Sequence, residues 1–239
     1  MGSPRKCEIQ QPGSEGGCSG DRAMGTVQLT RDIITLKGSA AIVSEFFCYA
    51  VNRCPSAGPL QLVPSIILFQ RGIYPAENFA RVKKYGLTML ICEDERVKTF
   101  INTVTRQMAE WLETGSLERV VLVVASIASG EVLERWSFNI ETDKEVTEKG
   151  VVREKPDKEI MTDIQGVMRQ ITSSVTFLPH LEEACTFDLL VYTPPDSKVP
   201  PLWGESDARL INNPQVVKLR SVDTKVHRVD AMVAYKFDG

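Results

Sequence analysis

Three stretches of the chain carry apolar residues at the spacing of amphipathic helices. The first spans Gly38 to Asn52, with Ser39 as its expected N-cap. The second spans Glu93 to Glu113; its first turn is acidic, which suits the positive end of the helix dipole, and Gly115 can take the left-handed conformation that ends a helix. The third spans Pro156 to Leu178, with the proline at the first helical position. The pattern predicts three helices, each with one buried face.

Shorter stretches have the patterns of β-strands. Leu87 to Cys92 is a compact apolar run, and Val120 to Ala125 is β-branched and continuous, which is typical of a strand covered on both faces. The chain then turns back into a strand with one apolar and one polar face. The apolar face comprises Val132, Trp136, Phe138 and Ile140. Three more strands are expected toward the C-terminus, at Cys185 to Thr193, Val216 to Val222 and Val229 to Tyr235.

The remaining segments lack such patterns. Residues 1–25 are rich in glycine and proline and have few bulky apolar residues, so we expect a disordered tail. The stretch from Arg53 to Pro64 contains three prolines, which predicts a loop. The charged stretch from Glu141 to Lys155 predicts a mobile, solvated loop. A short amphipathic turn with Phe79 and Val82 is expected before Leu87. Together the elements predict one α/β domain of the α+β type.

Composition narrows the classes of function. The chain has 239 residues and a formal net charge of −3, so no overall positive field favours nucleic acid, and no apolar run reaches the roughly 20 residues of a membrane-spanning helix. The N-terminus lacks the apolar stretch of a signal peptide. The six cysteines are scattered without a CxxC pair, which indicates the reducing cytosol or nucleus. With 43% hydrophobic residues, the chain should fold without a cofactor.

The sequence shows no catalytic or metal-binding motif. It has neither a phosphate-binding GxxxxGK[ST] loop nor a GxSxG elbow. The two histidines, His180 and His227, could in principle activate Cys185 or Cys48, but an ordinary polar or packing role is the favoured interpretation for each. No His or Cys pair stands at zinc spacing. We therefore predict that the protein is not an enzyme, and leave a cysteine-based activity as an alternative that a thiol-directed probe would test.

Two further features invite a binding interpretation. The basic cluster Arg81, Lys83 and Lys84 could contact an acidic partner, although a solvated surface is the favoured reading because no aromatic residues lie between the charges. Trp111 falls on the apolar stripe of its helix and indicates core packing. Trp203 lies instead in a proline-flanked irregular segment, where its indole can be sheltered only by docking onto another part of the molecule.

Several phrases in the sequence, in the same order, resemble one family. The most specific are Phe69–Pro75 (FQRGIYP) and Ser129–Trp136 (SGEVLERW), supported by Thr176–Pro179 (TFLP) and Met232–Lys236 (MVAYK). These phrases resemble the HORMA-domain family, and its spindle-checkpoint branch in particular. The resemblance covers Gly25 to Lys236.

The resemblance implies a fold and a mechanism. The fold would be a central, mostly antiparallel sheet backed by three helices, with a mobile C-terminal "safety belt". The implied boundaries are a tail at 1–25, the HORMA domain at 26–239 with an inserted loop at 53–65, and the belt at 194–239. Family members switch between an open and a closed fold, and the closed fold traps a peptide beneath the belt. An exposed strand edge, as expected at Cys185–Thr193, would be covered either by the chain's own C-terminal hairpin or by the peptide.

The resemblance also implies partners and a location. The trapped peptides would come from a kinetochore-anchored checkpoint partner of the Mad-one type and from the activator of the anaphase-promoting complex, so that anaphase is delayed. The protein would work in the nucleus, at the kinetochore and in the cytoplasm. The residues implied at the peptide site are Phe187, Leu189, Val191, Tyr192 and Trp203.

A second surface is implied on the third helix. The family's open–closed self-dimer, and its contact with a comet-type adaptor that leads to an AAA+ remodelling ATPase, use positions that match Arg169, Gln170 and Phe177. Arg169 and Gln170 lie off the apolar stripe of their helix, so they should be exposed. An alternative within the same fold is the HORMA subunit of a translesion polymerase or DNA-repair complex, which pull-down partners would distinguish.

Overall fold

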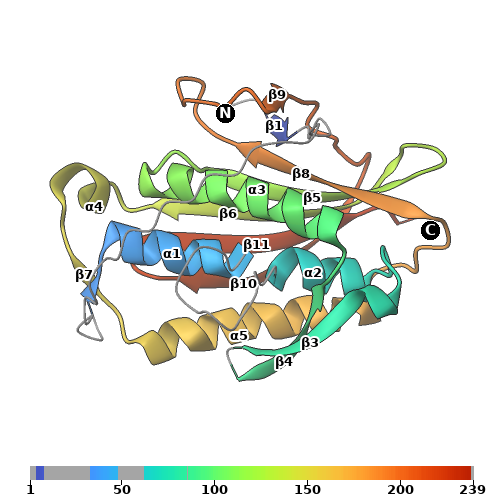
Figure 1. Ribbon diagram of the computed structural model, residues 1–239, viewed down its shortest axis with the longest axis horizontal. Helices are drawn as coiled ribbons and strands as arrows, with labels where there is room; N and C mark the ends of the chain where they lie inside the picture. Colours follow the sequence, from blue (N-terminus) through green and yellow to red (C-terminus); the bar gives the residue numbers. More distant parts are fainter. Residues whose placement is uncertain (1–3, 8–32, 48–61, 85, 238–239) are drawn as a thin grey trace, which may run out of the picture.

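The architecture is one large antiparallel sheet whose long helices lie against one face (Figure 1). The computed structural model describes residues 4–7, 33–47, 62–84 and 86–237. The large sheet has seven strands in the order β10-β11-β6-β5-β8-β1-β9. Its strands are β1 (Pro4–Cys7), β5 (Arg119–Ser126), β6 (Val132–Thr142), β8 (Cys185–Tyr192), β9 (Trp203–Glu205), β10 (Gln215–Asp223) and β11 (His227–Tyr235). The α+β prediction is thereby confirmed.

The helices and the two small sheets complete the described fold. The helices are α1 (Leu36–Phe47), α2 (Leu62–Gln70), α3 (Glu95–Glu113), α4 (Lys144–Lys149) and α5 (Asp157–Ser173), with short 3₁₀ turns at Ala76–Asn78 and Ser174–Thr176. One small sheet pairs β2 (Ile33–Ile34) with β7 (Arg153–Glu154). The other pairs β3 (Phe79–Lys84) with β4 (Leu87–Cys92). The three predicted helices correspond to α1, α3 and α5.

The centre of the sheet is buried on both sides, as the sequence of β5 predicts. Seven of the eight residues of β5 are buried, and β5 pairs along its length with β6 on one side and β8 on the other. The face toward the helices carries Leu122 and Val124, which belong to the main core. The opposite face carries Val121 and Val123, which pack with Leu190. Odd-numbered residues of β5 therefore share a face with even-numbered residues of β8, and even-numbered residues of β5 share the other face with odd-numbered residues of β8.

Helix α3 begins at Glu95, two residues after the predicted Glu93, and ends at Glu113 as its sequence predicts. The Asp94 carboxylate accepts hydrogen bonds from the backbone N–H groups of Arg96 and Val97, which caps the first turn. At the other end Gly115 has a φ of 68°, and the N–H of Ser116 reaches back to the carbonyl of Trp111 at 2.8 Å. This pattern is a Schellman motif, which requires a left-handed residue where the glycine stands.

The starts of the other two long helices differ from the prediction. Helix α1 begins at Leu36, and the Thr35 hydroxyl accepts the N–H of Gly38, so Ser39 is not the N-cap. Ser39 is instead fully buried inside the helix, where its hydroxyl bonds to Thr224 and His227. Pro156 precedes α5 as its N-cap residue and is not its first helical residue.

Short elements account for the remaining corrections. The prediction of a loop at 53–65 is wrong for residues 62–65, which form the start of helix α2. Pro64 is tolerated there because a backbone N–H in the first turn has no helical partner. Residues 53–61 lie outside the described part. The turn expected around Phe79 is strand β3. The stretch 141–155, predicted to be a loop, contains α4 and β7, which Arg153 joins by ion pairs to Asp143 and Glu145.

The predicted disordered tail is also wrong at one place. Residues 4–7 form strand β1 inside the large sheet, and the rest of 1–25 lies outside the described residues.

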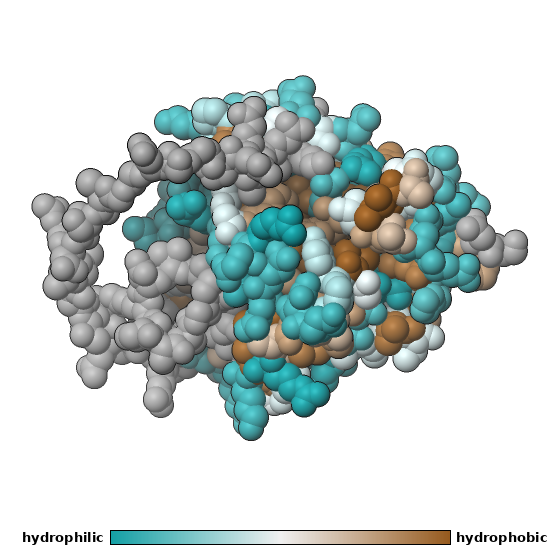
Figure 2. Space-filling model, turned by 45° about the vertical axis from the view of Figure 1, so that its right-hand side comes forward, coloured by the Kyte–Doolittle hydropathy of each residue, from teal (hydrophilic) through white to brown (hydrophobic). Residues whose placement is uncertain are grey.

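Hydrophilic residues predominate on the surface that Figure 2 presents, where apolar residues form small separate groups. Within the described ranges, none of the helices combines the length and the apolar character that crossing a membrane requires.

Candidate peptide-binding site

The edge of β8 is the part of the sheet where the sequence places peptide binding. β5 occupies one side of β8 over its whole length. On the other side lies β1, antiparallel to β8, with Pro4 opposite Tyr192, Arg5 opposite Val191 and Lys6 opposite Leu190. β1 in turn pairs with β9, so it fills a slot between β8 and β9 (Figure 1). From Cys185 to Leu189, this edge of β8 has no strand partner among the described residues.

The side chains predicted at this site point to the two faces of the sheet. Leu189 and Val191 are buried in the main core, and Phe187 makes edge-to-face contacts with Tyr74 and Phe100. These three residues therefore offer their backbone, and not their side chains, to a strand at the edge. The residue that carries this backbone pairing together with Val191 and Tyr192 is Leu190, which the sequence analysis did not single out.

Tyr192 lies on the opposite face of the sheet, among basic side chains. The guanidinium carbon of Arg119 is 5.2 Å from the centre of the tyrosine ring, a cation–π arrangement. Arg135 donates a long hydrogen bond of 3.5 Å to the tyrosine hydroxyl. Burial lowers the pKa of Arg135, although its guanidinium stays charged at neutral pH.

Trp203 is sheltered as the sequence predicts, and Trp111 is its shelter. The two indoles meet edge to face with their centres 5.1 Å apart, and Trp203 is only 7% exposed. The indole N–H of Trp111 donates to the carbonyl of Lys198, 3.1 Å away. The chain segment 194–205 is thereby fixed to helix α3 on the helical face of the sheet.

A second contact, just after this segment, holds the chain on the other face. Arg209 forms an ion pair with Asp188, with 2.6 Å between nitrogen and oxygen. Asp188 lies opposite Val123 of β5 and thus on the face away from α3. The segment after β8 therefore reaches round the edge of the sheet and contacts both faces.

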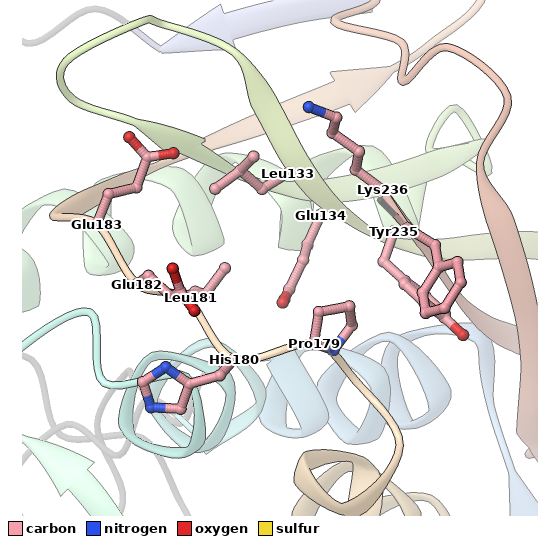
Figure 3. Close-up of a pocket in the computed structure, with 10 residues that line it drawn as sticks. Leu133, Glu134, Pro179, His180, Leu181, Glu182, Glu183, Tyr235 and Lys236 are labelled. Carbon is pink, nitrogen blue, oxygen red and sulfur yellow. The ribbon is translucent and has the colours of Figure 1, made fainter. Parts of the chain in front are cut away.

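The C-terminal hairpin lies at the far side of the sheet. β11 pairs with β6 over nine residues, from His227 opposite Thr142 to Tyr235 opposite Glu134. Beyond the strand, the N–H of Lys236 donates to the carbonyl of Leu133, and the Lys236 ammonium pairs with Glu131. Figure 3 shows the hollow of about 500 Å³ at this end, between the end of β11, β6 and the connection from α5 to β8.

His227 fixes the start of β11 to two helices. Its side chain is fully buried; Nε2 lies 3.3 Å from the carbonyl of Leu112 in α3, and Nδ1 lies 2.6 Å from the hydroxyl of Ser39 in α1. Because a carbonyl can only accept, Nε2 carries the proton and Nδ1 accepts from Ser39. Burial lowers the pKa of His227 to about 4, against a smaller upward effect of the Leu112 carbonyl. The histidine is therefore a neutral packing residue, consistent with its favoured interpretation.

A buried ion pair joins the two most specific phrases of the sequence. Arg71, from the first phrase, donates to Glu134, from the second, with 2.7 Å between Nε and Oε1. The other oxygen of Glu134 accepts the indole N–H of Trp136 at 3.0 Å, and Arg71 also donates to the carbonyl of Pro179. The charged side chains are 4% and 2% exposed. In Figure 3 Glu134 points from β6 toward Pro179.

Sequence reasoning missed this pair, although a signal was present. Glu134 shares the parity of Trp136, Phe138 and Ile140, which form the apolar face of its strand. A carboxylate on a buried face needs a charged or hydrogen-bonding partner.

The residues predicted at the second surface all lie on α5 and the turn that follows it. Arg169 is exposed, and Phe177 is 42% exposed beside the similarly exposed Val175. Gln170 is half-buried, because its side-chain oxygen accepts the backbone N–H of Arg220 in β10 at 2.5 Å. Exposure is therefore confirmed for Arg169, while Gln170 also helps to fix the C-terminal hairpin.

Of the two cysteines considered as nucleophiles, Cys185 lies in the described part of the chain, and it is poorly suited to nucleophilic catalysis. Burial, and then the nearby carboxylates of Glu183 and Glu134, raise the pKa of Cys185, which lowers its thiolate fraction at neutral pH. Cys48 lies outside the described residues.

Comparison with known proteins agrees with this architecture. The HORMA domain family model matches residues 39–227. The chain is 60% identical over 208 residues to the mitotic spindle checkpoint protein MAD2 of Arabidopsis thaliana, covering 87% of this chain and 93% of that protein. It is 48% identical over 211 residues to the human mitotic spindle assembly checkpoint protein MAD2A, covering 88% and 97%.

A solved structure gives the same result. A chain in the crystal structure of the mitotic checkpoint complex superposes with a TM-score of 0.71 and 42% identity, covering 84% of this chain and 99% of that one. The chain therefore belongs to the HORMA-domain family and, within it, to the MAD2 group of mitotic spindle checkpoint proteins.

Proposed function

We propose that this protein is a spindle assembly checkpoint adaptor that traps an extended peptide between β8 and β9. The observation that carries the proposal is that this slot already accommodates a strand, β1, hydrogen-bonded on both sides. An added strand gains affinity from backbone hydrogen bonds, which any sequence can supply, and selectivity from the side chains beside it.

In this proposal, the conformation described above is the closed one. Segment 194–205 covers the slot, and the C-terminal hairpin lies beside β6, at the side of the sheet away from β8. In the open state the hairpin would leave β6 and cover the β8 edge itself. The two states compete because the hairpin and a peptide cannot pair with the same edge together.

The trapped peptides would come from a kinetochore-anchored partner of the Mad-one type and from the activator of the anaphase-promoting complex. Sequestering the activator would delay anaphase, with the protein acting in the nucleus, at the kinetochore and in the cytoplasm. Identities of 48% and 60% to checkpoint MAD2 proteins favour this function over that of a polymerase subunit. Affinity capture would decide: recovery of polymerase or repair subunits in place of checkpoint proteins would overturn the proposal.

The direct test is binding of a peptide that carries the closure motif of the kinetochore partner. We expect a stable complex and a slow exchange between two monomer forms that ion-exchange chromatography separates. Hydrogen exchange should show increased protection in Cys185–Tyr192 and in 194–205 when the peptide is bound. No complex at high peptide concentration, with unchanged exchange in both segments, would contradict the proposal.

Replacing Trp203 should speed the release of a trapped peptide. Trp203→Ala removes the edge-to-face contact with Trp111 that fixes the belt over the slot. We expect the dissociation rate to rise at least tenfold, which corresponds to about 1.4 kcal/mol. Fluorescence anisotropy of a labelled peptide after dilution into unlabelled peptide measures the rate. The neighbouring Leu202, which is 52% exposed, supplies the control: Leu202→Ala should leave the rate within about twofold.

The second proposed surface predicts a separation of functions. Arg169→Ala should abolish the open–closed self-dimer and weaken binding of the comet-type adaptor, which leads to the AAA+ ATPase, because Arg169 is exposed. Peptide capture should stay unchanged, since the slot lies on other elements. Gel filtration and peptide binding measure the two properties. Loss of both would show that the substitution disturbs the fold; a matched control is Lys158→Ala, an exposed cation at the other end of α5.

A further inference from the structure

The slot between β8 and β9 is occupied by a segment of the protein itself. Strand β1 comes from the far N-terminus, and its register pairs Arg5 and Lys6 with both neighbouring strands. We propose that Pro4–Cys7 is a built-in ligand of the slot, which a partner peptide must displace. The inference rests on the proposed function, because it assigns a competitor to the same site.

The backbone of β1 is suited to this place. Successive N–H groups of a strand point in opposite directions, so those of Arg5 and Lys6 face different neighbours. Pro4 has no N–H, and it stands at the first position of the strand, where a proline is tolerated. The segment therefore needs no particular side chain to be held, only backbone N–H groups in sequence after the proline.

The side chains on the wall of the slot add a charge preference. Arg5 lies directly opposite Glu205 of β9, on the same face of the sheet, and is only partly exposed. Opposite charges at directly paired positions stabilise antiparallel strands. Lys6 lies opposite Gly204, which has no side chain. The slot thus favours an extended segment with a basic residue opposite Glu205.

Attachment to the same chain makes even a short ligand effective. Residues 8–32, which are 25 residues, connect β1 to β2. Fully extended they span roughly 80 Å, several times the radius of gyration of about 17 Å expected for a domain of this size. An intramolecular ligand acts at an effective concentration on the order of millimolar. A partner peptide then binds only the fraction of molecules in which the slot is free, and its apparent affinity falls by that fraction.

The test uses the full chain and a probe taken from its own sequence. The probe is a fluorescein-labelled synthetic peptide of residues 1–10, with serine in place of Cys7. The variant Arg5→Pro/Lys6→Pro removes both N–H groups and should empty the slot without touching the folded domain. We expect the probe to bind this variant at least tenfold more tightly than it binds the wild-type chain, which corresponds to at least 90% occupancy by β1.

An alanine pair is the matched control. Arg5→Ala/Lys6→Ala keeps both N–H groups and loses only the charges, so the affinity for the probe should differ from that of the wild type by less than about fivefold. Hydrogen exchange gives an independent readout: the amides of Leu190–Tyr192 should exchange faster in the proline variant alone. Thermal unfolding of all three proteins checks that the domain stays folded.

The outcomes separate this inference from the proposed function. Equal binding of the probe to the wild type and the proline variant, or no binding to either, would overturn the built-in ligand. If a closure-motif peptide of the kinetochore partner then binds both proteins equally, the proposed function stands alone. If that peptide binds neither protein, the proposed function itself fails. A wild-type dimer that becomes a monomer in the proline variant would place β1 in the slot of a second copy and overturn the intramolecular arrangement.

Discussion

Replacing Glu134 by alanine is expected to lower the free energy of unfolding by about 3–5 kcal/mol. The substitution leaves the guanidinium of Arg71 buried without its carboxylate, and it removes the acceptor of the Trp136 indole N–H. An uncompensated buried charge is among the most destabilising defects that a single substitution creates. Urea unfolding followed by circular dichroism measures the loss.

A double variant distinguishes a lost ion pair from a general packing defect. Arg71→Met/Glu134→Gln removes both charges, keeps an acceptor for Trp136 and nearly conserves volume. Replacing both members of a buried pair is often close to neutral, so the double variant should be more stable than Arg71→Met alone. If the losses of unfolding free energy in Arg71→Met and Glu134→Gln simply add in the double variant, the two side chains are not coupled, and a lost ion pair does not explain the destabilisation.

Acid should destabilise the protein through His227, by about 3 kcal/mol between pH 6.5 and pH 4. The folded state depresses the pKa of His227 to about 4, whereas the unfolded state keeps the ordinary value near 6.5. Between these values the unfolded chain binds a proton that the folded chain excludes. Stability is therefore complete above pH 6.5 and falls as the pH falls toward 4.

The pH profile of urea unfolding measures this effect against matched variants. The partners of the His227 ring are the hydroxyl of Ser39 and the carbonyl of Leu112, and Thr224 bonds to Ser39 beside the ring. His227→Gln should be less stable at pH 7 and lose less stability on acidification than the wild type. His180→Gln, which alters an exposed histidine, should keep the wild-type profile. The same profile in His227→Gln and the wild type would exclude His227 as the cause.

The sequence predicted the long elements well because each repeats its pattern over several turns or pleats. Helices α3 and α5 and strands β5, β6, β8, β10 and β11 all belong to this group. Most of the missed elements are too short to show a period, and in others charged residues suggested a loop. The missed elements are α2, α4, β2, β3, β7 and β9. Strand β1 is the extreme case, because four residues that include Pro4, Arg5 and Lys6 carry no apolar pattern at all. Only pairing with distant strands makes them a strand.

Polar residues on apolar faces explain what the sequence did not predict at the site. Ser39 falls within the buried face of α1, and Glu134 falls within the buried face of β6. Each position marks a long-range partner, His227 for the serine and Arg71 for the glutamate, that no local pattern can identify. The edge of β8 was predicted as the receiving strand; Leu189 and Val191 are buried there, and the strand that pairs with this edge, β1, does so through backbone groups.

The two fasteners of segment 194–209 differ in chemistry, and this difference bears on how long a captured strand stays bound. The indole contact between Trp203 and Trp111 is apolar, whereas the link between Arg209 and Asp188 is ionic and partly open to solvent. Added salt screens the second and leaves the first almost untouched. If a strand is held beneath both, it can escape sideways only while both are undone at the same time, so its residence time depends on the product of two independent opening probabilities.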